Sequence, residues 1–381
     1  MTRITRIVCS YLSILLPFSA QASEAVEPLR LAVIGLNHGH VEGVLWNATS
    51  RDDLTIVGIY DPNYKLFEKF RDKYKLDPNL FYADLDQMLD ETKPEAASVM
   101  TPISEHLDVV KSCAPRGVHT LLEKPLAYTL DDALAMQALG KEHGVHVLTN
   151  YETSWYASVR ETKKMIASGE AGLPTRVIFR HGHKGPIEIG CSEEFVHWLA
   201  DPEFNGGGAI VDFGCYGANI MTWFMGQAPL SVTAITQQIK PDLYPKVDDD
   251  ATILLTYPNA TAVIQASWSW THDNKELDVH TTKMSIHAEK WDSLTVRKPD
   301  QERAARTPAQ KPAHLQDEWT YLRTLVKGNC EIDPLSSTEN NIIVAAILDA
   351  AIESARTGET VTLRAAYEDS VQRDVHSDTE G

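Results

Sequence analysis

The hydrophobic pattern of residues 29–150 alternates between short apolar runs and amphipathic stretches. The apolar runs predict strands, and the stretches between them follow the 3.6-residue period of helices. The predicted strands are 31–34, 54–60, 81–82, 97–100, 118–122 and 145–149, and the predicted helices are 40–50, 64–74, 84–89, 105–114 and 130–143. Strands that alternate with helices predict a parallel sheet covered on both faces.

After residue 150 the pattern changes to longer strands. The runs at 176–179, 230–235, 251–257 and 261–270 predict strands, and a turn at 258–260 joins the last two into a hairpin. In the last run, tryptophans alternate with serines over 267–270, so we expect one aromatic and one polar face. This pattern of strands and turns predicts an antiparallel sheet with one covered side. Helical patterns follow at 318–327 and 340–356.

These patterns predict an α/β fold with two domains. We expect a Rossmann dinucleotide-binding domain at 23–150. An α+β domain with a large open antiparallel sheet is expected at 151–365, with its C-terminal helices packed back on the Rossmann domain.

The two ends of the chain differ from the rest. Arg3 and Arg6 precede an apolar run at 7–18, and Ala20-Gln-Ala22 has the small-x-small form of a cleavage site. Residues 1–22 therefore predict a signal peptide, and we expect a secreted or periplasmic protein. No later segment is apolar for long enough to cross a bilayer, so no membrane insertion is expected after cleavage. The polar, acidic residues 366–381 predict a flexible tail.

The net charge limits the possible binding partners, and the spacing of the cysteines bears on whether they form disulfides. The net charge of -18 argues against nucleic acid and anionic membrane surfaces as partners. Beyond the predicted signal peptide, the cysteines are Cys113, Cys191, Cys215 and Cys330, with no C-x-x-C pair. We expect them to be buried free thiols.

The first predicted strand ends in the sequence Gly35-Leu-Asn-His-Gly-His40. In a Rossmann unit, Gly35 would permit the tight turn and Gly39 the close approach of a pyrophosphate to the following helix. Asp61 follows the second strand, where a carboxylate binds the ribose 2′-hydroxyl and repels a 2′-phosphate, which favours NAD over NADP. The loop alone fits a plain strand–turn–helix equally well.

A metal site is the competing interpretation of this loop. His38 and His40 are two residues apart, but no carboxylate or thiol nearby in the sequence completes a set of ligands. We therefore expect no metal site.

Two later motifs carry chemistry. Glu123-Lys-Pro125 ends a predicted strand, which places Lys124 at the edge of a parallel sheet where ligands bind, with Glu123 able to hold its ammonium. Downstream, Asp212 and Tyr216 lie four residues apart after a glycine-rich segment, so they share one face of a helix start.

Together these motifs resemble the glucose–fructose oxidoreductase / inositol dehydrogenase / MocA (Gfo/Idh/MocA) family. The matching residues are the glycine turn at 35–39, Asp61, Thr101-Pro-x-x-x-His106, Glu123-Lys-Pro125 and Gly-Gly-Ala-x-x-Asp-x-Gly-x-Tyr at 207–216. The resemblance spans residues 29 to about 360. It implies a sugar substrate held between the two domains, and association through the open sheets into a homodimer or homotetramer.

The resemblance also implies roles for residues. Lys124 would bind the hydroxyl being oxidised, and Asp212 would position the sugar. Many members have a histidine acid/base where this chain has Tyr216, which can replace it if the Lys124 ammonium lowers its pKa; alternatively, Tyr216 packs against the sheet. The expected NAD contacts are Gly35, Asn37, His38, Gly39, Asp61, Thr101, Pro102, His106, Glu123 and Lys124.

A second polar cluster follows the first strand of the second domain, at 180–186 and 191–198. We interpret it as a sugar-binding loop, because its histidines are too loosely spaced to favour a metal. The expected substrate contacts are Tyr151, His183, Lys184 and His197.

The sequence therefore predicts an NAD-dependent oxidoreductase acting on a sugar or glycoside hydroxyl. We expect its cofactor to be tightly bound, since no nicotinamide pool is expected outside the cytoplasm. Two alternatives stay open. One is an NAD-dependent glycoside hydrolase that works by transient 3-keto oxidation and elimination. The other is a non-catalytic secreted sugar-binding protein.

Overall fold

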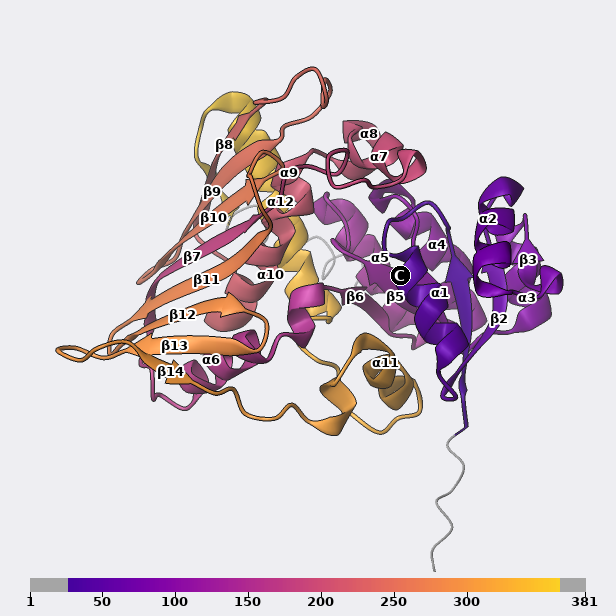
Figure 1. The fold of residues 1–381 in the computed structure, drawn as a ribbon, viewed down its shortest axis with the longest axis horizontal. Coiled ribbons are helices and arrows are strands. Elements are labelled where there is room, and N and C mark those ends of the chain that lie inside the picture. The colour runs from indigo at the N-terminus through magenta and orange to yellow at the C-terminus, as the bar shows by residue number, and fades with distance from the viewer. Residues whose placement is uncertain (1–26, 364–381) are drawn as a thin grey trace, which may run out of the picture.

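The computed structural model describes residues 27–363, which form two sheets with helices between and around them (Figure 1). The predicted signal peptide at 1–22 and the predicted tail at 366–381 lie outside the described residues. The predicted α/β architecture is confirmed, because a parallel sheet comes first along the chain and a mostly antiparallel sheet follows it.

The first sheet has six parallel strands in the order β3-β2-β1-β4-β5-β6. Its strands are β1 Leu29–Ile34, β2 Leu54–Tyr60, β3 Phe81–Tyr82, β4 Ala96–Val99, β5 His119–Glu123 and β6 Val147–Asn150. The order reverses direction between β1 and β4. In open parallel sheets, such a switch point opens a crevice at the carboxyl ends of the strands, where ligands bind.

Helices cover both faces of this sheet. They are α1 Val41–Ser50, α2 Tyr64–Tyr74, α3 Leu85–Thr92, α4 His106–Cys113 and α5 Leu130–His143. Strand β1 shows why an unbroken apolar run fits here. Leu31 and Val33 join the core on one side of the sheet, while Ala32 and Ile34 join the core on the other.

The second sheet has nine strands in the order β14-β13-β12-β11-β7-β10-β9-β8-β15. They are β7 Pro174–Gly182, β8 Ser231–Gln237, β9 Asp250–Thr256, β10 Thr261–Ser267, β11 Asn274–Thr281, β12 Ser285–Lys290, β13 Ser293–Arg297, β14 Ala304–Arg306 and β15 Val361–Thr362. Every neighbouring pair is antiparallel except β7 and β10, which run parallel.

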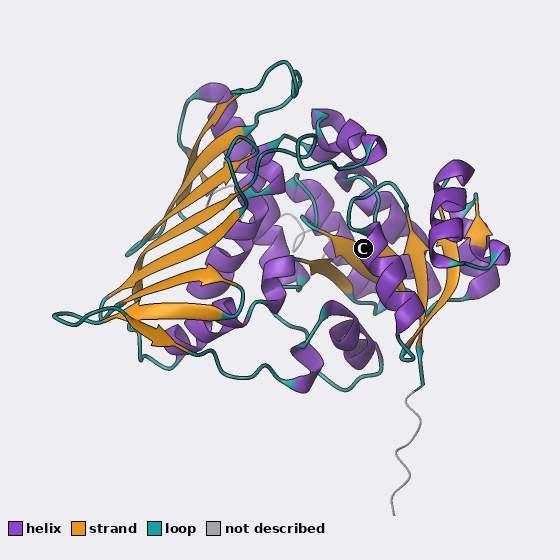
Figure 2. Cartoon of the chain, in the orientation of Figure 1, coloured by secondary structure: helices purple, strands orange, loops and turns teal. Residues whose placement is uncertain are grey.

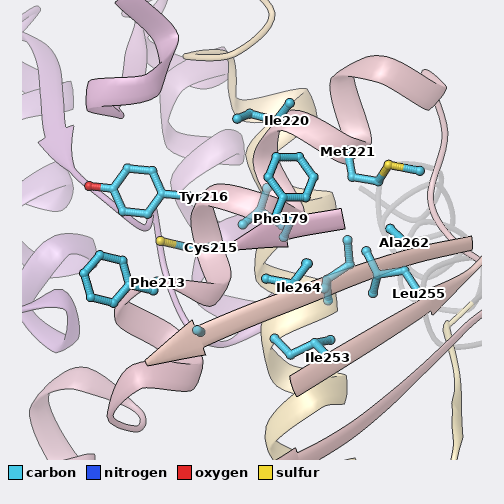
Figure 3. Packing of buried hydrophobic residues seen from close by; sticks show 14 of the residues in the cluster. Phe179, Phe213, Cys215, Tyr216, Ile220, Met221, Ile253, Leu255, Ala262 and Ile264 are labelled. Atoms are coloured by element: carbon cyan, nitrogen blue, oxygen red, sulfur yellow. The ribbon is translucent and has the colours of Figure 1, made fainter. Parts of the chain in front are cut away.

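Helices lie on one face of the second sheet, and the other face is free of them (Figure 2). The remaining α-helices of residues 27–363 are α6 Ala157–Ala167, α7 Glu193–Leu199, α8 Pro202–Asn205, α9 Ala209–Asp212, α10 Gly214–Met225, α11 Glu318–Val326 and α12 Thr338–Thr357. On the covered face, Ile253 of β9 and Ile264 of β10 pack in the same buried cluster as Ile220 and Met221 of α10 (Figure 3). The predicted one-sided burial is confirmed.

The predicted strand at 261–270 is too long. Strand β10 ends at Ser267, after which the chain turns into the interior. The Trp268 amide donates to the Asp249 carbonyl at 2.7 Å, and the Trp268 side chain is fully buried. The expected aromatic and polar faces are therefore wrong at this point, because Ser267 is itself buried.

Two late helices return to the first domain. Trp319 and Leu322 of α11 belong to the same buried cluster as Leu31. Helix α12 contributes side chains to the cores of both domains, because Ile342 packs with the first sheet while Ile347 packs with the second. Within the described residues, no helix has the length and apolar character that crossing a bilayer requires.

A buried amide network joins α10 to α12. Asn219 Nδ2 donates to the Leu335 carbonyl at 2.9 Å and to Asn341 Oδ1 at 3.2 Å. Asn341 Nδ2 in turn donates to the carbonyls of Leu335 and Ser337, at 3.1 and 2.8 Å. Buried amides need these partners, so the network fixes the approach of the two helices.

We expect Asn341→Ala to lower the free energy of unfolding by about 2–4 kcal/mol, because it removes three buried hydrogen bonds of the network. Denaturant unfolding checks this value. The matched control is Asn329→Ala at an exposed position, which should change stability by less than about 0.5 kcal/mol. Equal effects of the two substitutions would contradict the structural role of the network.

Candidate active site

A pocket of about 500 Å³ lies where the crevice of the first sheet meets the second domain. Both domains supply its walls. Lys124 follows β5, Asp212 ends α9, Tyr216 lies in the first turn of α10, and His183 follows β7. The fold therefore brings together four of the residues that the sequence singled out, from segments far apart in the chain.

A buried ion pair forms the centre of this pocket. Lys124 Nζ donates to the Asp212 carboxylate and, at 3.1 Å, to the Asp212 carbonyl oxygen. The second carboxylate oxygen of Asp212 accepts from Trp268 Nε1 at 2.8 Å. Burial opposes both charges, but the pairing outweighs it, so the pKa of Lys124 is raised and that of Asp212 is lowered. Lys124 is therefore a charged hydrogen-bond donor at neutral pH.

Tyr216 is buried beside this pair. Its pKa is raised well above the ordinary value by burial, with the Glu152 carboxylate adding to the effect. The expectation that Lys124 lowers this pKa is wrong, because the Lys124 charge is taken up by Asp212 and its Nζ lies 5.3 Å from the Tyr216 ring centroid. The Tyr216 hydroxyl points away from the second sheet in Figure 3.

Two pocket residues were missed by the sequence analysis. Glu152, just after β6, accepts hydrogen bonds from Lys275 Nζ and, at 2.6 Å, from the Tyr156 hydroxyl. Burial opposes its charge, but Lys275 and Tyr156 lower its pKa, so it is ionised. Lys275 lies on β11, whose polar sequence gives no strand signal.

His181 lies behind the pocket. It points inward from β7 and is almost fully buried, with its ring centroid 5.2 Å from that of Tyr216. Burial lowers its pKa to about 3. The neighbouring His183 lines the pocket, and its Nδ1 accepts from the Gly185 amide at 2.9 Å.

The other predicted substrate contacts lie elsewhere. Tyr151 is fully buried behind Tyr216, with 5.6 Å between ring centroids, and does not line the pocket. Lys184 is exposed, and its carbonyl accepts from Lys240 Nζ. His197 lines a different pocket, beside Asp61, because α7 crosses the nucleotide end of the crevice.

The glycine loop has the conformation that a phosphate-binding turn needs. Gly35 has φ +89°, and a Cβ there would lie 2.8 Å from the Met100 backbone. The Asn37 carbonyl accepts from Trp198 Nε1 at 3.3 Å. The His38 ring packs against Phe195 of α7, with 4.8 Å between ring centroids, and Phe195 also covers Gly39. Helix α7 therefore holds the loop against the first sheet.

Asp61 lies at the end of β2 beside this loop and is buried. Its carboxylate accepts from the amides of Leu36 and Asn63, both at 2.7 Å. A second pocket, of about 640 Å³, is lined by Gly35, Asn37, Asp61, Thr101, Glu105, Glu193, Glu194 and His197, among others. The glycine turn and the acidic residue fit the pyrophosphate and ribose of a dinucleotide.

Of the other predicted cofactor contacts, His38, Gly39 and Lys124 line the 500 Å³ pocket instead. Pro102, His106 and Glu123 line neither of the two pockets. Pro102 is buried, and His106 Nδ1 bonds the Leu126 carbonyl at 3.0 Å. Burial lowers the pKa of His106, which is consistent with a neutral ring that holds the segment after Glu123-Lys-Pro125 in place.

The structure changes the interpretation of His38 and His40. The Glu123 carboxylate lies 3.1 Å from His40 Nδ1, and potential ligand atoms of His38, His40 and Glu123 all lie within 4.8 Å of one another. The expectation that no carboxylate accompanies the histidines is therefore wrong. The sheet places β1 and β5 on the two sides of β4 with their carboxyl ends at one edge, which no local pattern reveals.

The four cysteines of the described residues are unpaired. Cys113 and Cys215 are buried, and burial raises the pKa of each thiol to about 12. Cys191 and Cys330 are partly exposed, so the expectation of burial holds for two of the four.

The fold and the site define a two-domain oxidoreductase that binds a nicotinamide dinucleotide. The family models agree. Residues 29–151 match the model "Oxidoreductase family, NAD-binding Rossmann fold", and residues 159–287 match the model "GFO/IDH/MocA C-terminal domain". The chain belongs to the GFO/IDH/MocA oxidoreductase family.

Curated relatives in this family include sugar dehydrogenases. The chain is 21% identical over 342 residues to the D-xylose 1-dehydrogenase [NADP(+)] of Haloarcula marismortui, a match covering 88% of this chain and 93% of the relative. It is 24% identical to the D-apiose dehydrogenase of Rhizobium rhizogenes, covering 81% and 90% of the two chains.

Solved structures share the fold. The aldose-aldose oxidoreductase of Caulobacter crescentus, complexed with glycerol, superimposes with a TM-score of 0.74 at 21% identity, covering 88% of this chain and all of that one. An inositol dehydrogenase homolog from Azotobacter vinelandii, complexed with NAD+, gives 0.75 at 18% identity, covering 88% and 97%.

The buried, neutral His181 makes stability depend on pH. Its folded pKa of about 3 lies below the unfolded value of about 6.5, so the unfolded state gains a proton first and stability falls as pH falls below 6.5. Between pH 7 and pH 5, this one group costs about 2 kcal/mol of unfolding free energy.

We therefore expect His181→Gln to reduce the loss of stability between pH 7 and pH 5 by about 2 kcal/mol, whatever its effect at pH 7. Denaturant unfolding at the two pH values measures the difference. His280→Gln, at an exposed position on β11, serves as the control. A wild-type slope in the His181 variant would show that this histidine titrates normally.

Proposed function

We propose that the protein oxidises a hydroxyl group of a sugar or glycoside by hydride transfer to a tightly held NAD. The observation that carries the proposal is the Lys124–Asp212 ion pair. It is buried at the meeting point of the two domains, next to a glycine turn and an acidic residue suited to a dinucleotide. Bound NAD would supply the hydride acceptor.

Lys124 has the properties needed to bind the reacting hydroxyl. Its pairing with Asp212 keeps it charged, and it lines the pocket. An ammonium donor next to the substrate oxygen stabilises the negative charge that develops as the hydroxyl proton leaves. Asp212, itself fixed by Trp268, orients that ammonium.

The proton acceptor is a separate question, because Tyr216 is neutral at physiological pH. A neutral phenol donates or relays a proton but cannot take one up without giving one away. The ionised carboxylates that line the pocket include Asp212 and Glu152. Glu152 binds Lys275, whose Nζ lies 5.8 Å from the Tyr216 ring centroid, so Glu152 is the acceptor that we propose for a relay through Tyr216.

The preference for NAD over NADP rests on the charge of the nucleotide pocket. Asp61 is joined there by Glu105, Glu193 and Glu194, and no lysine or arginine is among the described residues that line it. A 2′-phosphate would bring two further negative charges into this environment, whereas a ribose hydroxyl donates to a carboxylate. Curated relatives include NADP-dependent enzymes, so the preference belongs to this chain's own residues.

A sugar is favoured by the relatives and by the charge of the pocket. The relatives named above act on xylose and apiose. In this pocket Lys124 pairs with Asp212 and Lys275 with Glu152, so both ammonium groups are already matched by carboxylates. A neutral polyol suits such a pocket better than a phosphate or carboxylate, which would need an unmatched cation.

Two further features belong to the proposal. We expect the protein to work outside the cytoplasm, as residues 1–22 indicate, with its NAD retained through the reaction cycle. We also expect it to associate through the helix-free face of the second sheet, where Ile235 and Leu254 are exposed.

The first test is to denature the purified protein and identify any released nucleotide by mass spectrometry. We expect NAD at about one per chain. Aldoses and glycosides are then offered without added NAD. An oxidised sugar formed with a second sugar as hydride acceptor supports the proposal, while cleavage of glycosides supports the hydrolase alternative. If the protein releases no NAD and does not bind added NAD(H), only the sugar-binding alternative is left.

We expect Lys124→Met to lower kcat about 10²- to 10³-fold, because it removes the donor to the reacting oxygen. NAD content should be retained, and it provides the check on folding. Lys184→Met, at an exposed lysine outside the pocket, is the control and should leave kcat unchanged. A variant with wild-type kcat would exclude Lys124 from the chemistry.

We expect Asp61→Asn to raise the ratio of NADP to NAD affinity by about 10- to 100-fold, because it removes the charge opposite a 2′-phosphate. The asparagine oxygen keeps an acceptor for one of the two backbone amides that Asp61 binds. Titration of nucleotide-free protein with each dinucleotide measures the ratio. Asp52→Asn, an exposed site away from the pocket, is the control. An unchanged ratio would assign the preference to other groups.

A further inference from the structure

We propose that His38, His40 and Glu123 bind a divalent transition-metal ion, with an open coordination position facing the substrate pocket. The inference goes beyond the oxidoreductase proposal and does not depend on it. It assigns one ligand set to three residues whose side chains meet at the carboxyl ends of β1 and β5.

The geometry is the first support. The potential ligand atoms of the three residues lie within 4.8 Å of one another, and among residues 27–363 no other group of three such side chains does so. Metal–ligand bonds of about 2.1 Å place tetrahedral ligand atoms about 3.4 Å apart. The widest pair must therefore close by up to about 1.4 Å, and the half-exposed His40 side chain has room to move.

The second support is the charge of Glu123. Its side chain is 4% exposed, and among the described residues its one ion-pair partner is His40, which is charged only when protonated. Nearby Lys124 is paired with Asp212. A buried carboxylate without a permanent positive partner is costly, and a bound dication would remove that cost.

The ligand chemistry fits. His38 Nδ1 now accepts a hydrogen bond from the His40 amide at 3.0 Å, so a metal bound through this nitrogen would replace that bond. Two imidazoles and one carboxylate are a ligand set of catalytic zinc, which keeps its fourth position for water or substrate. His38 and His40 both line the 500 Å³ pocket together with Lys124, so that fourth position faces the substrate.

The nearby ammonium of Lys124 is the main opposing charge. The Asp212 carboxylate offsets the repulsion between this ammonium and a bound metal ion, and the Glu152–Lys275 pair contributes no net charge. The carboxylate of Glu123 therefore leaves this end of the pocket with a net negative charge before a metal binds. Oxygen-preferring Mg²⁺ is a poor match to two imidazoles, whereas Zn²⁺ and Co²⁺ are good ones.

The test uses the full chain, purified without a histidine tag, stripped with a chelator and titrated with Zn²⁺. We expect one Zn²⁺ per chain by elemental mass spectrometry after desalting, and no competition from excess Mg²⁺. His40→Gln and Glu123→Gln should each weaken Zn²⁺ binding at least about 10-fold, the loss found when even an outer-shell partner of a metal is removed. His280→Gln and Glu302→Gln, at exposed positions, are the matched controls.

His40→Gln decides the matter if Glu123→Gln does not fold, because the His40 side chain is 54% exposed. A wild-type protein that binds no stoichiometric Zn²⁺ would overturn the proposal, as would equal binding by wild type and His40→Gln. The visible spectrum of the Co²⁺-loaded protein gives a second readout, since loss of an imidazole changes the coordination geometry. NAD content is measured on the same samples, so failure of the metal site and failure of the oxidoreductase proposal give different results.

Discussion

The Lys124–Asp212 ion pair is the interaction on which the arrangement of the crevice depends. One partner follows the fifth strand of the parallel sheet, and the other ends a short helix that packs on the open sheet. Removing one member of a buried pair leaves an uncompensated charge, which typically costs about 3–5 kcal/mol. Apolar residues of similar size would fill the space at least as stably. The pair is therefore better explained by the chemistry of the pocket than by stability.

The second domain is shaped to present Asp212 at this point. Gly208 has no room for a side chain, because a Cβ there would lie 1.8 Å from the Asp248 carbonyl oxygen. The Asp248 carboxylate accepts from the amides of Gly208 and Ile210, at 2.8 and 2.7 Å. The glycine-rich segment and the first residues of α9 thus fold tightly against the loop before β9 that carries Asp248. Trp268, just after β10, closes the other side of Asp212.

Much of the fold was predictable because the strongest signals are local. The bounds of β2, α2 and α5 match the predicted 54–60, 64–74 and 130–143, since each has a cap or a turn at its ends. Strand β11 was missed because its sequence, Asn-Lys-Glu-Leu-Asp-Val-His-Thr, has polar side chains on most positions. It is held by pairing with β7 and β12, and Leu277 and Val279 are its only buried side chains.

Some residues of the candidate site were likewise predictable from local motifs, and others were not. The glycine turn, Asp61, Lys124 and Asp212 belong to short motifs and were found from sequence. Glu152 was not, because its role comes from Lys275, which lies on the missed strand β11. The predicted direction of the Tyr216 pKa shift was wrong. The sequence places a lysine near Tyr216, but it does not show that this lysine is already paired with Asp212.

The two ends of the crevice differ in charge, and this difference limits what each end can bind. At the catalytic end, both ammonium groups that line the pocket are matched by carboxylates. At the nucleotide end, the lining residues carry carboxylates and no lysine or arginine within the described part of the chain. A pyrophosphate there has no side-chain cation to meet, so its binding must come from backbone N–H groups and from the start of α1. Such binding depends on the exact loop conformation, which explains why α7 packs Phe195 and Trp198 so closely against residues 37–39.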